Sequence, residues 1–479
     1  MVSNTAPGDL EDQKLPRVDE KVPQSQGFDL RALDNTASES YEGSYKDGAG
    51  SRFIERLKTW GVESRGIYPV PVEHRTDPQF SKSFFVWLSC NLNILSFSEG
   101  TVGVLVYGLT FRQAAGVIVG FNLLSALPPA YFSTFGPKLG LRQMVQARYS
   151  FGWFGAIIPG VFNLLVMMGY NILNAILAGQ TLSVVSGGRM SWNVGIVIIS
   201  LISLLASRPS TRPGYELTCG PAAIDFVFRI PDLELDLTSG DGSQPLAPAR
   251  SVLSFGATVA AFIISYAALM SDYTNYMRVD VASWKVFLFS YLGLLLPTAS
   301  VQLIGAAFAA SLPANASWMA GYEAGGAGGL VDAILSPSKG FARVPRYAFS
   351  IAGTGILIPL AIVGSTRFEE TLVDFLGLVG YWSATFIAVV AAEHVVFRQR
   401  DWTAYDISQW NTAGELPPGM AAIGACVCSF GVIVPCMDQV WFTGPIARTT
   451  GDIGFEVGLV LSGLLYIPLR TLEKRVSRR

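Results

Sequence analysis

Stretches of about 20 mainly apolar residues recur from residue 84 almost to the C-terminus, and this feature restricts the fold most. A helix of that length crosses the hydrocarbon core of a bilayer, which is about 30 Å thick. Inside lipid the backbone has to satisfy its own hydrogen bonds, as it does in a helix. Half of the residues are hydrophobic and only 15% are charged, fewer than soluble domains carry. The sequence therefore predicts an all-α, multi-pass membrane protein with the lipid bilayer as a partner.

About ten such spans can be placed along the chain. They are residues 84–109, 113–135, 152–182, 192–206, 251–277, 284–311, 345–364, 374–397, 416–436 and 453–472. We expect one transmembrane domain, 83–475, after a cytosolic and partly disordered tail, 1–82. Residues 207–250 interrupt this domain as an atypical polar loop. Residues 312–344 contain the glycine-rich "GYEAGGAGGL", which lacks the Gly-Lys-Ser/Thr ending of a phosphate-binding loop, and we expect a flexible connection there.

Lysine and arginine gather beside particular spans, and these groups predict how the bundle is oriented. They are Arg52, Arg56, Lys58, Arg75 and Lys82 before the first span, Lys138, Arg142 and Arg148 after the second, Arg398 and Arg400 after the eighth, and Arg470, Lys474, Arg475, Arg478 and Arg479 at the end. Loops that stay on the cytosolic side of a membrane carry an excess of positive charge. With an even number of spans, both termini are therefore expected in the cytosol.

The first span contains "CNLNILSFSEGTVGVLVYGL", which places several polar residues and glycines at membrane depth. An unpaired polar group in lipid costs several kcal/mol, so these side chains have to face the protein interior or water. Glycines beside them permit local unwinding, which frees backbone groups to bind a ligand. We expect a discontinuous helix that lines a midplane site. The candidate binding residues are Ser96, Ser98, Asn91 and Asn93. A helix-packing face made of small residues is the alternative.

The third span, "FNLLVMMGYNILNAILAGQ", carries a second polar set. At about 100° per residue, Asn163, Tyr170 and Asn174 share one helix face, and Asn171 lies beside them. An asparagine amide offers a donor and an acceptor, which match the edge of a nucleobase or a similar heterocycle. A tyrosine ring offers a surface for stacking. Packing between helices could explain one asparagine more easily than three.

Ionisable residues inside or at the end of a span are functional candidates by default. Glu99 lies in the first span, and Asp272 lies near the end of the span that contains "AFIISYAALMSDYTNYM". Either carboxylate could carry a proton or pair with another cation. Asp272 could equally be a helix cap or make a loop contact. Tyr266 precedes Asp272 in the same segment.

Other classes of function find no support in the sequence. The net charge of -2, without a basic stripe, argues against nucleic acid as a partner. His74 lies in the tail and His394 beside arginines at a span end, and no zinc-ligand spacing or nucleophile–base pair is present. The five cysteines make no disulfide framework. We therefore expect neither an enzyme nor a metal or cofactor site.

Several segments together resemble the purine–cytosine permease branch of the nucleobase–cation symporter-1 family. They are "ERLKTWGVESRGIYPVPVEHRTDPQFSKSFFVWLSCNLNILSFSEGTVG", "GYNILNAILAGQ", "SDYTNYM", "GLVGYWSATFIAVVAAEHVVFR" and "MDQVWFTGPIARTTGDIGFEVGLVLSGLLYIPLRTLEKR". The resemblance implies a LeuT-like bundle of twelve helices, with two inverted five-helix repeats and two further helices. It also implies proton-driven transport of cytosine, adenine, guanine or hypoxanthine, or in some relatives of pyridoxine, typically across a fungal plasma membrane.

The resemblance also implies roles for single residues. Ser96 resembles the family's substrate-binding serine of the first span, and Asn174 its asparagine of the third span. Tyr266 stands where members commonly have a stacking tryptophan, so the smaller ring implies an altered substrate preference or weaker stacking. Glu99 departs from the small or hydroxyl residue that the resemblance leads us to expect.

Two spans of the family have no counterpart in this chain. The polar residues 207–250 stand in place of the fifth span, and the eighth is absent between "GGLVDAILSPSKGFA" and "RVPRYAFSIAG". The chain is therefore either an incorrectly spliced form or a degenerate, non-transporting relative, and the sequence of the transcript would decide between them. The glycosylation sequon at Asn315 would lie outside the cell in a twelve-span arrangement and in the cytosol in a literal ten-span one.

Overall fold

The computed structural model describes residues 67–186, 189–206, 248–335, 361–362 and 367–477, which lie in one compact unit. Six helical segments in this part are long and apolar enough to cross a membrane. They are Phe111–Leu139, Ile157–Val184, Ala249–Ala268, Ser283–Ala314, Phe368–Phe397 and Gly454–Ser477. Shorter apolar helices cover Ile94–Leu105, Trp192–Leu201 and Met420–Cys436. The predicted span 345–364 falls almost entirely outside the described residues, and so do 207–247 and the place of the missing eighth span.

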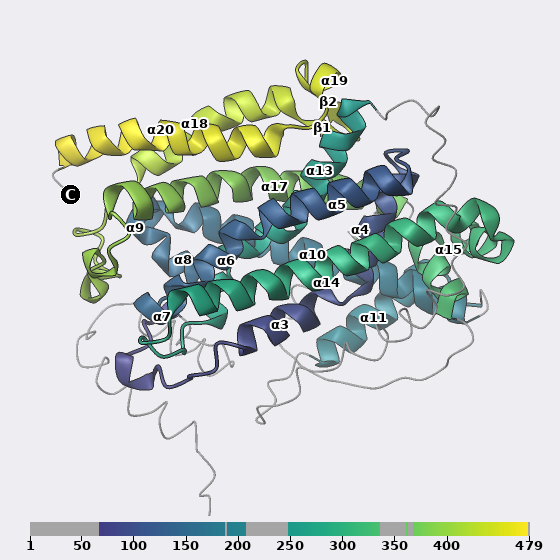
Figure 1. Cartoon of the computed structure of the whole chain (residues 1–479), viewed down its shortest axis with the longest axis horizontal. Helices are drawn as coiled ribbons and strands as arrows, with labels where there is room; N and C mark the ends of the chain where they lie inside the picture. The colour runs from purple at the N-terminus through teal and green to yellow at the C-terminus, as the bar shows by residue number, and fades with distance from the viewer. Residues whose placement is uncertain (1–66, 187–188, 207–247, 336–360, 363–366, 478–479) are drawn as a thin grey trace, which may run out of the picture. The chain divides into compact units, whose positions relative to one another are not determined.

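Helices account for nearly all the regular structure of these residues (Figure 1). The longer ones are α3 (Lys82–Asn91), α4 (Ile94–Leu105), α5 (Phe111–Ser125), α6 (Leu127–Ser133), α9 (Arg148–Gly155), α10 (Ile157–Val185), α11 (Trp192–Ala206), α13 (Ala249–Ile264), α14 (Ser283–Ser311), α15 (Ala316–Leu335), α17 (Phe368–Ala392), α18 (Met420–Ile433) and α20 (Gly454–Ser477). Short helices are α7 (Phe135–Leu139), α8 (Gln143–Gln146) and α19 (Ala447–Thr450). Strands β1 (Asp438–Gln439) and β2 (Phe442–Thr443) form an antiparallel hairpin.

The first predicted span is a discontinuous helix, as expected, but the break lies at the polar Asn93 and not at the glycines, since Gly100 and Gly103 lie within helix α4. Helix α3 ends at Asn91 and α4 begins at Ile94. Asn93 between them has an extended backbone, with φ -139° and ψ 163°. Its side-chain oxygen accepts a hydrogen bond of 2.8 Å from the backbone N–H of Ser96, which caps the start of α4.

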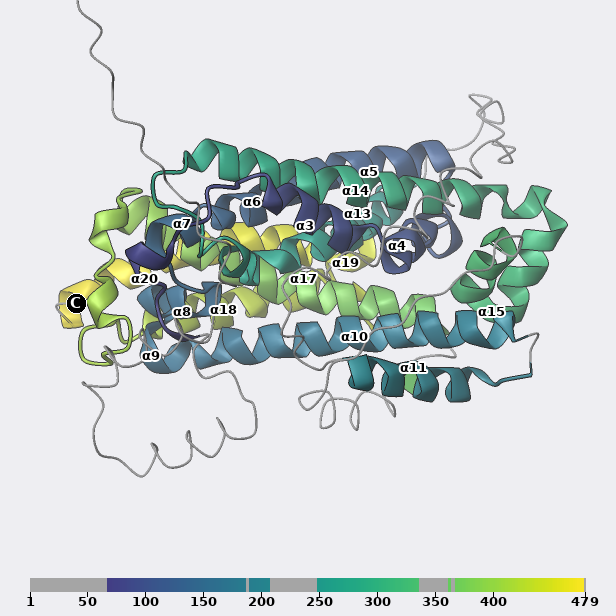
Figure 2. The same cartoon turned by 90° about the horizontal axis from the view of Figure 1, so that it is seen from below.

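The predicted span 251–277 is interrupted as well. Helix α13 gives way to the 3-10 turn η4 (Ser265–Ala268), and a second turn, η5 (Met270–Tyr273), follows. Leu269 between them leaves the helical region, with φ -142° and ψ 3°. Two membrane segments are thus broken; α14 packs against both α3 and α4, and α13 contacts α4 (Figure 2).

Glycine allows α4 and α14 to approach until their backbones touch. A Cβ atom at Gly100 would lie 2.0 Å from the carbonyl oxygen of Gln302, and one at Gly305 would lie 2.1 Å from that of Phe97. No larger residue fits at either position, so the glycines allow the two helices to pack in close contact.

The lysine and arginine groups that border the predicted spans meet, as far as the structure describes them, at one end of the bundle, which we call the basic end. Arg75 donates a hydrogen bond of 3.1 Å to the carbonyl oxygen of Lys138. Phe135 of α7 lies 4.9 Å from the ring of Trp402, in the loop that follows Arg398. Arg398 in turn lies over the ring of Tyr149, 5.2 Å from its centroid, next to Arg148.

Helix α14 runs from the basic end to the opposite end. Lys138 donates to the carbonyl oxygen of Val279 at 2.7 Å, shortly before α14 begins. The 29 residues of α14 rise about 44 Å. Helix α15, which begins directly after Asn315, lies at the far end of α14 (Figure 1). Asn315 therefore lies at the end opposite the basic end, which is where the twelve-span arrangement expects it.

The glycine-rich segment is a helix, so the expectation of a flexible connection was wrong for its described part. Helix α15 is broken at Gly325 and Gly326, where the φ of Gly326 is +58°. The chain turns back there, and a Cβ at Gly329 would lie 2.1 Å from the carbonyl oxygen of Gly321. The glycines allow a tight turn and close packing against α10. They do not form a flexible connection.

Two of the predicted boundaries, those of the N-terminal tail and of the polar loop, also differ from the structure. Of the predicted tail, residues 67–81 fold onto the domain, where Val70 is buried and Asp77 pairs with Met277 in a parallel bridge. The polar loop 207–250 ends in helix, since α13 begins at Ala249. Polar composition did not reveal these contacts.

Candidate functional site

An aromatic cluster occupies the space beside the two breaks. The ring of Tyr266, in η4, lies 5.0 Å from the ring of Trp87 in α3. It also stacks on Tyr170 of α10, with 6.4 Å between centroids and 15° between planes. The hydroxyl of Tyr266 donates to the side-chain oxygen of Asn91 at 3.2 Å. Tyr266 therefore joins the last turn of α3 to the unwound part of the other broken segment.

Tyr170 connects α10 to the end of α13. Its hydroxyl lies 2.9 Å from the hydroxyl of Ser265 and donates to the carbonyl oxygen of Phe262 at 3.2 Å. The sequence pointed to Tyr170 and Asn91 but not to Trp87 or Ser265. Trp87 looked like an ordinary apolar residue, and the available signal for Ser265 was only its position next to Tyr266.

Both candidate serines of the first span are buried in the start of α4. The hydroxyl of Ser96 donates to Asn93 at 3.3 Å, in addition to the bond made by its backbone N–H. The hydroxyl of Ser98 donates to the carbonyl oxygen of Ile94 at 3.0 Å. Ser96 and Asn93 therefore lie at the break itself, whereas Ser98 is satisfied within its own helix. The break and the N-terminal end of α4 offer backbone groups to a polar ligand.

The asparagines of α10 are placed differently from the serines. Asn171 and Asn174 are exposed, and each donates to the carbonyl oxygen four residues earlier, that of Met167 and of Tyr170, at 2.9 Å. Among the described residues, no hydrogen bond given by the structure joins them to α4 or η4. Asn174 lies one turn beyond Tyr170 on the same face, so it borders the aromatic cluster without contacting Ser96.

The two ionisable candidates have separate positions. Glu99 is fully buried between α4, α5 and α14, where Gln302 donates to its Oε2 atom at 2.7 Å. Asp272 lies in η5, and its Oδ1 atom accepts a 2.8 Å hydrogen bond from the backbone N–H of Gln143 at the start of α8. Burial raises the pKa of Asp272, and the hydrogen bond from Gln143 opposes this rise. The contacts of Asp272 are those of a helix cap.

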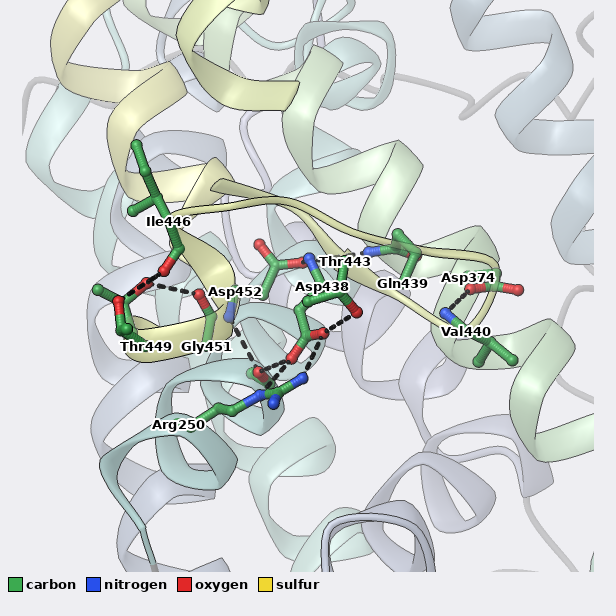
Figure 3. A network of polar contacts seen from close by, with 12 residues as sticks. Arg250, Asp374, Asp438, Gln439, Val440, Thr443, Ile446, Thr449, Gly451 and Asp452 are labelled. Atoms are coloured by element: carbon green, nitrogen blue, oxygen red, sulfur yellow. Dashed lines mark hydrogen bonds and ion pairs between the residues drawn. The ribbon is translucent and has the colours of Figure 1, made fainter. Parts of the chain in front are cut away.

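A polar network at the end opposite the basic end fixes the start of α13 (Figure 3). Arg250 donates two hydrogen bonds to Asp438 of the β1–β2 hairpin, at 3.0 and 2.9 Å. The carboxylate of Asp452 is buried and accepts from the hydroxyl of Tyr381 in α17 and from the amide of Gln439 at 3.1 Å. The backbone N–H of Asp452 donates to the hydroxyl of Ser254 in α13 at 2.9 Å. The sequence analysis did not identify this network.

At the basic end, a pocket of about 280 Å³ lies under the loop that follows α17. Glu393 beside it accepts hydrogen bonds from Arg398 at 3.2 Å and from Arg470 at 3.3 Å. His394 is buried there, and its Nδ1 atom lies 3.0 Å from the hydroxyl of Tyr405. Across the described residues, no group of three or more His, Cys, Asp or Glu side chains could hold a metal ion.

Comparison with known proteins finds relatives along most of the chain. The family model described as "Permease for cytosine/purines, uracil, thiamine, allantoin" matches residues 69–206 and 235–342. Purine-cytosine permease fcyB of Emericella nidulans is 30% identical over 506 residues, which cover 93% of this chain and 98% of that protein. Purine-cytosine permease FCY2 of Saccharomyces cerevisiae is 30% identical, with 90% and 89% covered. The vitamin B6 transporter TPN1 of the same yeast is 24% identical, with 88% and 89% covered.

The match with fcyB is longer than this chain, 506 aligned positions against 479 residues. The relative therefore contains residues without a counterpart here. This agrees with the expectation that the chain lacks part of the family's length, although it does not locate the gap.

Solved structures show the same fold. Mhp1, a nucleobase-cation-symport-1 family transporter, in a closed conformation with bromovinylhydantoin bound, has a TM-score of 0.55 at 16% identity and covers 86% of this chain and 96% of its own. Inward-facing Mhp1 has a TM-score of 0.58 at 15% identity, with 86% and 94% covered. These similarities confirm the transporter bundle that the sequence led us to expect. The chain belongs to the family of permeases for cytosine/purines, uracil, thiamine and allantoin.

Proposed function

We propose that this protein is a secondary active transporter that carries a nucleobase such as cytosine, adenine, guanine or hypoxanthine across the plasma membrane together with a proton. Family membership supports transport of this substrate class, since the relatives fcyB and FCY2 are purine-cytosine permeases. The observation that carries the proposal is the position of Tyr266, which lies in one interrupted membrane segment, donates a hydrogen bond to Asn91 at the break of the other and stacks on Tyr170.

This position suits a flat heterocycle. An aromatic ring binds the face of a planar base through stacking. Unwound backbone next to the ring offers donors and acceptors for the edge of the base. In this proposal Tyr266 stacks on the substrate, Ser96 and Asn93 bind its edge from the first break, and Asn174 binds from α10 with Asn171 beside it. Alternating access then requires the broken segments to move relative to α10.

Uptake of radiolabelled cytosine, adenine and pyridoxine in a cell that lacks its own permeases tests the function. We expect uptake of a nucleobase, and we expect Asn174→Ala to abolish or severely weaken it. Asn193→Ala is the matched control, because Asn193 is exposed on α11. Both variants are compared at equal amounts of protein in the plasma membrane.

Other results would contradict the proposal in distinct ways. Uptake of pyridoxine alone would favour a vitamin B6 permease, the activity of the relative TPN1. Absence of any uptake from a correctly localised protein would favour a non-transporting relative. Undiminished uptake by Asn174→Ala would remove Asn174 from the binding site while leaving the substrate class unaffected.

A further inference from the structure

We infer that Glu99 is the proton-binding group of this transporter and that it binds the proton at the interface of α4, α5 and α14, held by Gln302 and Asn122, and not in the substrate site. The inference rests on the proposed function, because it specifies where the coupled proton is bound.

A chain of side-chain hydrogen bonds crosses three helices at this interface. Asn122 of α5 donates to the side-chain oxygen of Gln302 in α14 at 2.6 Å. The Nε2 atom of Gln302 donates to the Oε2 atom of Glu99 in α4 at 2.7 Å. All three residues are fully buried, with an exposed fraction of 0%. Both amides therefore donate in the direction of Glu99.

The surroundings of Glu99 suit a neutral carboxylic acid better than a charged carboxylate. Its Oε1 atom is buried and has no hydrogen-bond partner among the described residues. The single donor is a neutral amide, and no lysine or arginine in the described part of the chain interacts with the carboxylate. A buried charge without a counter-ion is costly, whereas a protonated acid loses most of that cost. The proton adds to a carboxylate oxygen as an O–H group, and the carboxylate returns when the proton leaves.

The groups that face Glu99 from the other elements cannot replace a counter-ion. Among the described residues, Tyr170 of α10 and Tyr266 of η4 are the titratable side chains that interact electrostatically with Glu99. Helices α5 and α14 present the amides of Asn122 and Gln302. Glu99 is therefore the one carboxyl group among these facing side chains.

The packing around Glu99 explains how its charge can act on the conformation of α4. Gly100, the next residue, brings α4 against the backbone of Gln302. A negative charge at Glu99 would have to remain buried in this closely packed interface or draw water into it, and either change disfavours contact between α4 and α14. Helix α4 is joined to α3 only through the non-helical Leu92 and Asn93, so it can tilt at the break.

The same helix links the proton to the substrate. Ser96 lies three residues before Glu99, at the start of α4. When a proton binds one arrangement of α4 more tightly than another, it shifts the helix towards that arrangement. The affinity for a substrate held by Ser96 changes as a result. Linkage of this kind typically amounts to about a 5- to 150-fold change in affinity.

The closing experiment uses the full-length protein in lipid and measures protonation and transport separately. Infrared difference spectra recorded during a pH titration detect the carboxyl band of a buried protonated acid. We expect the band of the wild-type protein to contain a component that Glu99→Gln lacks, beside the bands of other buried carboxyl groups such as Asp272 and Asp452. Glu370→Gln is the matched control, because Glu370 pairs with Arg367 near the start of α17, with 44% of its side chain exposed. We expect this control to keep the component.

Transport provides the second measurement. We expect Glu99→Gln to bind the nucleobase with an affinity that no longer varies with pH, and to lose uptake against a gradient while keeping downhill exchange. Retention of both the full band and the proton-driven uptake in Glu99→Gln would overturn the inference. A wild-type protein that shows the Glu99 component but binds no nucleobase would contradict the proposed function and leave Glu99 as the proton-binding group.

A third variant keeps the inference testable if Glu99→Gln does not fold. Gln302→Leu keeps Glu99 but removes its hydrogen-bond donor. We expect this variant to shift the pH at which this component of the carboxyl band disappears, because the charged form of Glu99 loses its donor. An unchanged titration in Gln302→Leu would contradict the assignment of the component to Glu99.

Discussion

The hydroxyl of Tyr266 lies 3.2 Å from the side-chain oxygen of Asn91, and this hydrogen bond joins two membrane segments that are both interrupted. Asn91 is the last residue of α3, and Tyr266 lies in the first 3-10 turn after α13. Asn91 is fully buried, and its amide group donates back to the carbonyl oxygen of Trp87 at 2.8 Å. A movement of either break therefore changes the position of the aromatic ring that we propose as the stacking surface.

This contact leads to a prediction about two changes at one position. Tyr266→Phe keeps the ring and removes the hydrogen bond, which typically contributes about 0.5–1.5 kcal/mol. Tyr266→Ala removes the stacking surface, which for a base and an aromatic ring is worth about 1–3 kcal/mol. We expect Tyr266→Ala to weaken nucleobase affinity by about 5- to 150-fold and Tyr266→Phe by less, measured by competition for uptake.

Tyr291→Phe provides the control, because the hydroxyl of Tyr291 donates to the carbonyl oxygen of Leu123 at 3.0 Å, away from the site. We expect its affinity to match that of the wild-type protein. Equal affinities for Tyr266→Ala and wild type would exclude Tyr266 as the stacking residue.

The buried carboxylate of Asp452 should be important for the stability of the transporter. It accepts hydrogen bonds from Tyr381, from Gln439 and from the backbone N–H of Gly454, and thus connects α17, the hairpin and α20. Asp452→Ala removes the acceptor of the Tyr381 hydroxyl and of the Gly454 N–H, at a cost of about 1–3 kcal/mol for each, whereas Gln439 keeps its hydrogen bond of 2.6 Å to Tyr381. We expect a clear fall in the melting temperature of the purified protein.

Asp280→Ala is the matched control for this change. Asp280 is exposed and pairs with Arg278, so its removal should leave the melting temperature almost unchanged. Equal melting temperatures for Asp452→Ala and the wild-type protein would show that the network does not stabilise the fold.

Asp272 should behave as a structural cap and not as a coupling group. Its oxygen caps the start of α8 through Gln143, and asparagine is an equally good cap. We expect Asp272→Asn to keep proton-driven uptake and Asp272→Ala to lose about 0.5–2 kcal/mol of stability. Loss of the proton dependence in Asp272→Asn would return Asp272 to the coupling candidates.

The pH dependence of stability gives a second check on Asp272. Burial raises its pKa, so the folded protein binds a proton at Asp272 more tightly than the unfolded chain does. The stability contributed by this group is present below the pKa of the unfolded chain, near 3.8, and is lost as the pH rises through the raised folded pKa. We expect Asp272→Asn to lack this component in melting curves recorded between pH 3.5 and 6, roughly the range in which a carboxyl group with a raised pKa titrates.

The sequence predicted the broken first span, and the break lies at the polar Asn93, whereas Gly100 and Gly103, which were expected to permit unwinding, lie within α4. It did not predict the helical hairpin α15, because the same excess of glycine is typical of both a flexible loop and a tightly packed turn. For Glu99 the sequence indicated an ionisable residue inside the membrane, but not its partners. Gln302 and Asn122 are 203 and 23 residues away along the chain, and only the packing of α14 and α5 brings them together.

The last prediction concerns the orientation of the chain in the membrane. Ser317 is exposed next to Asn315, at the end of α14 that lies opposite the basic end. Positive charge favours the cytosolic side, so we expect Ser317→Cys to react in intact cells with a maleimide that does not cross the membrane. Thr403→Cys, in the loop at the basic end, should react only after the membrane is permeabilised. Cells that express the unsubstituted protein correct for the native cysteines. Labelling of Thr403→Cys but not of Ser317→Cys in intact cells would mean that the bundle has the opposite orientation, with Asn315 in the cytosol.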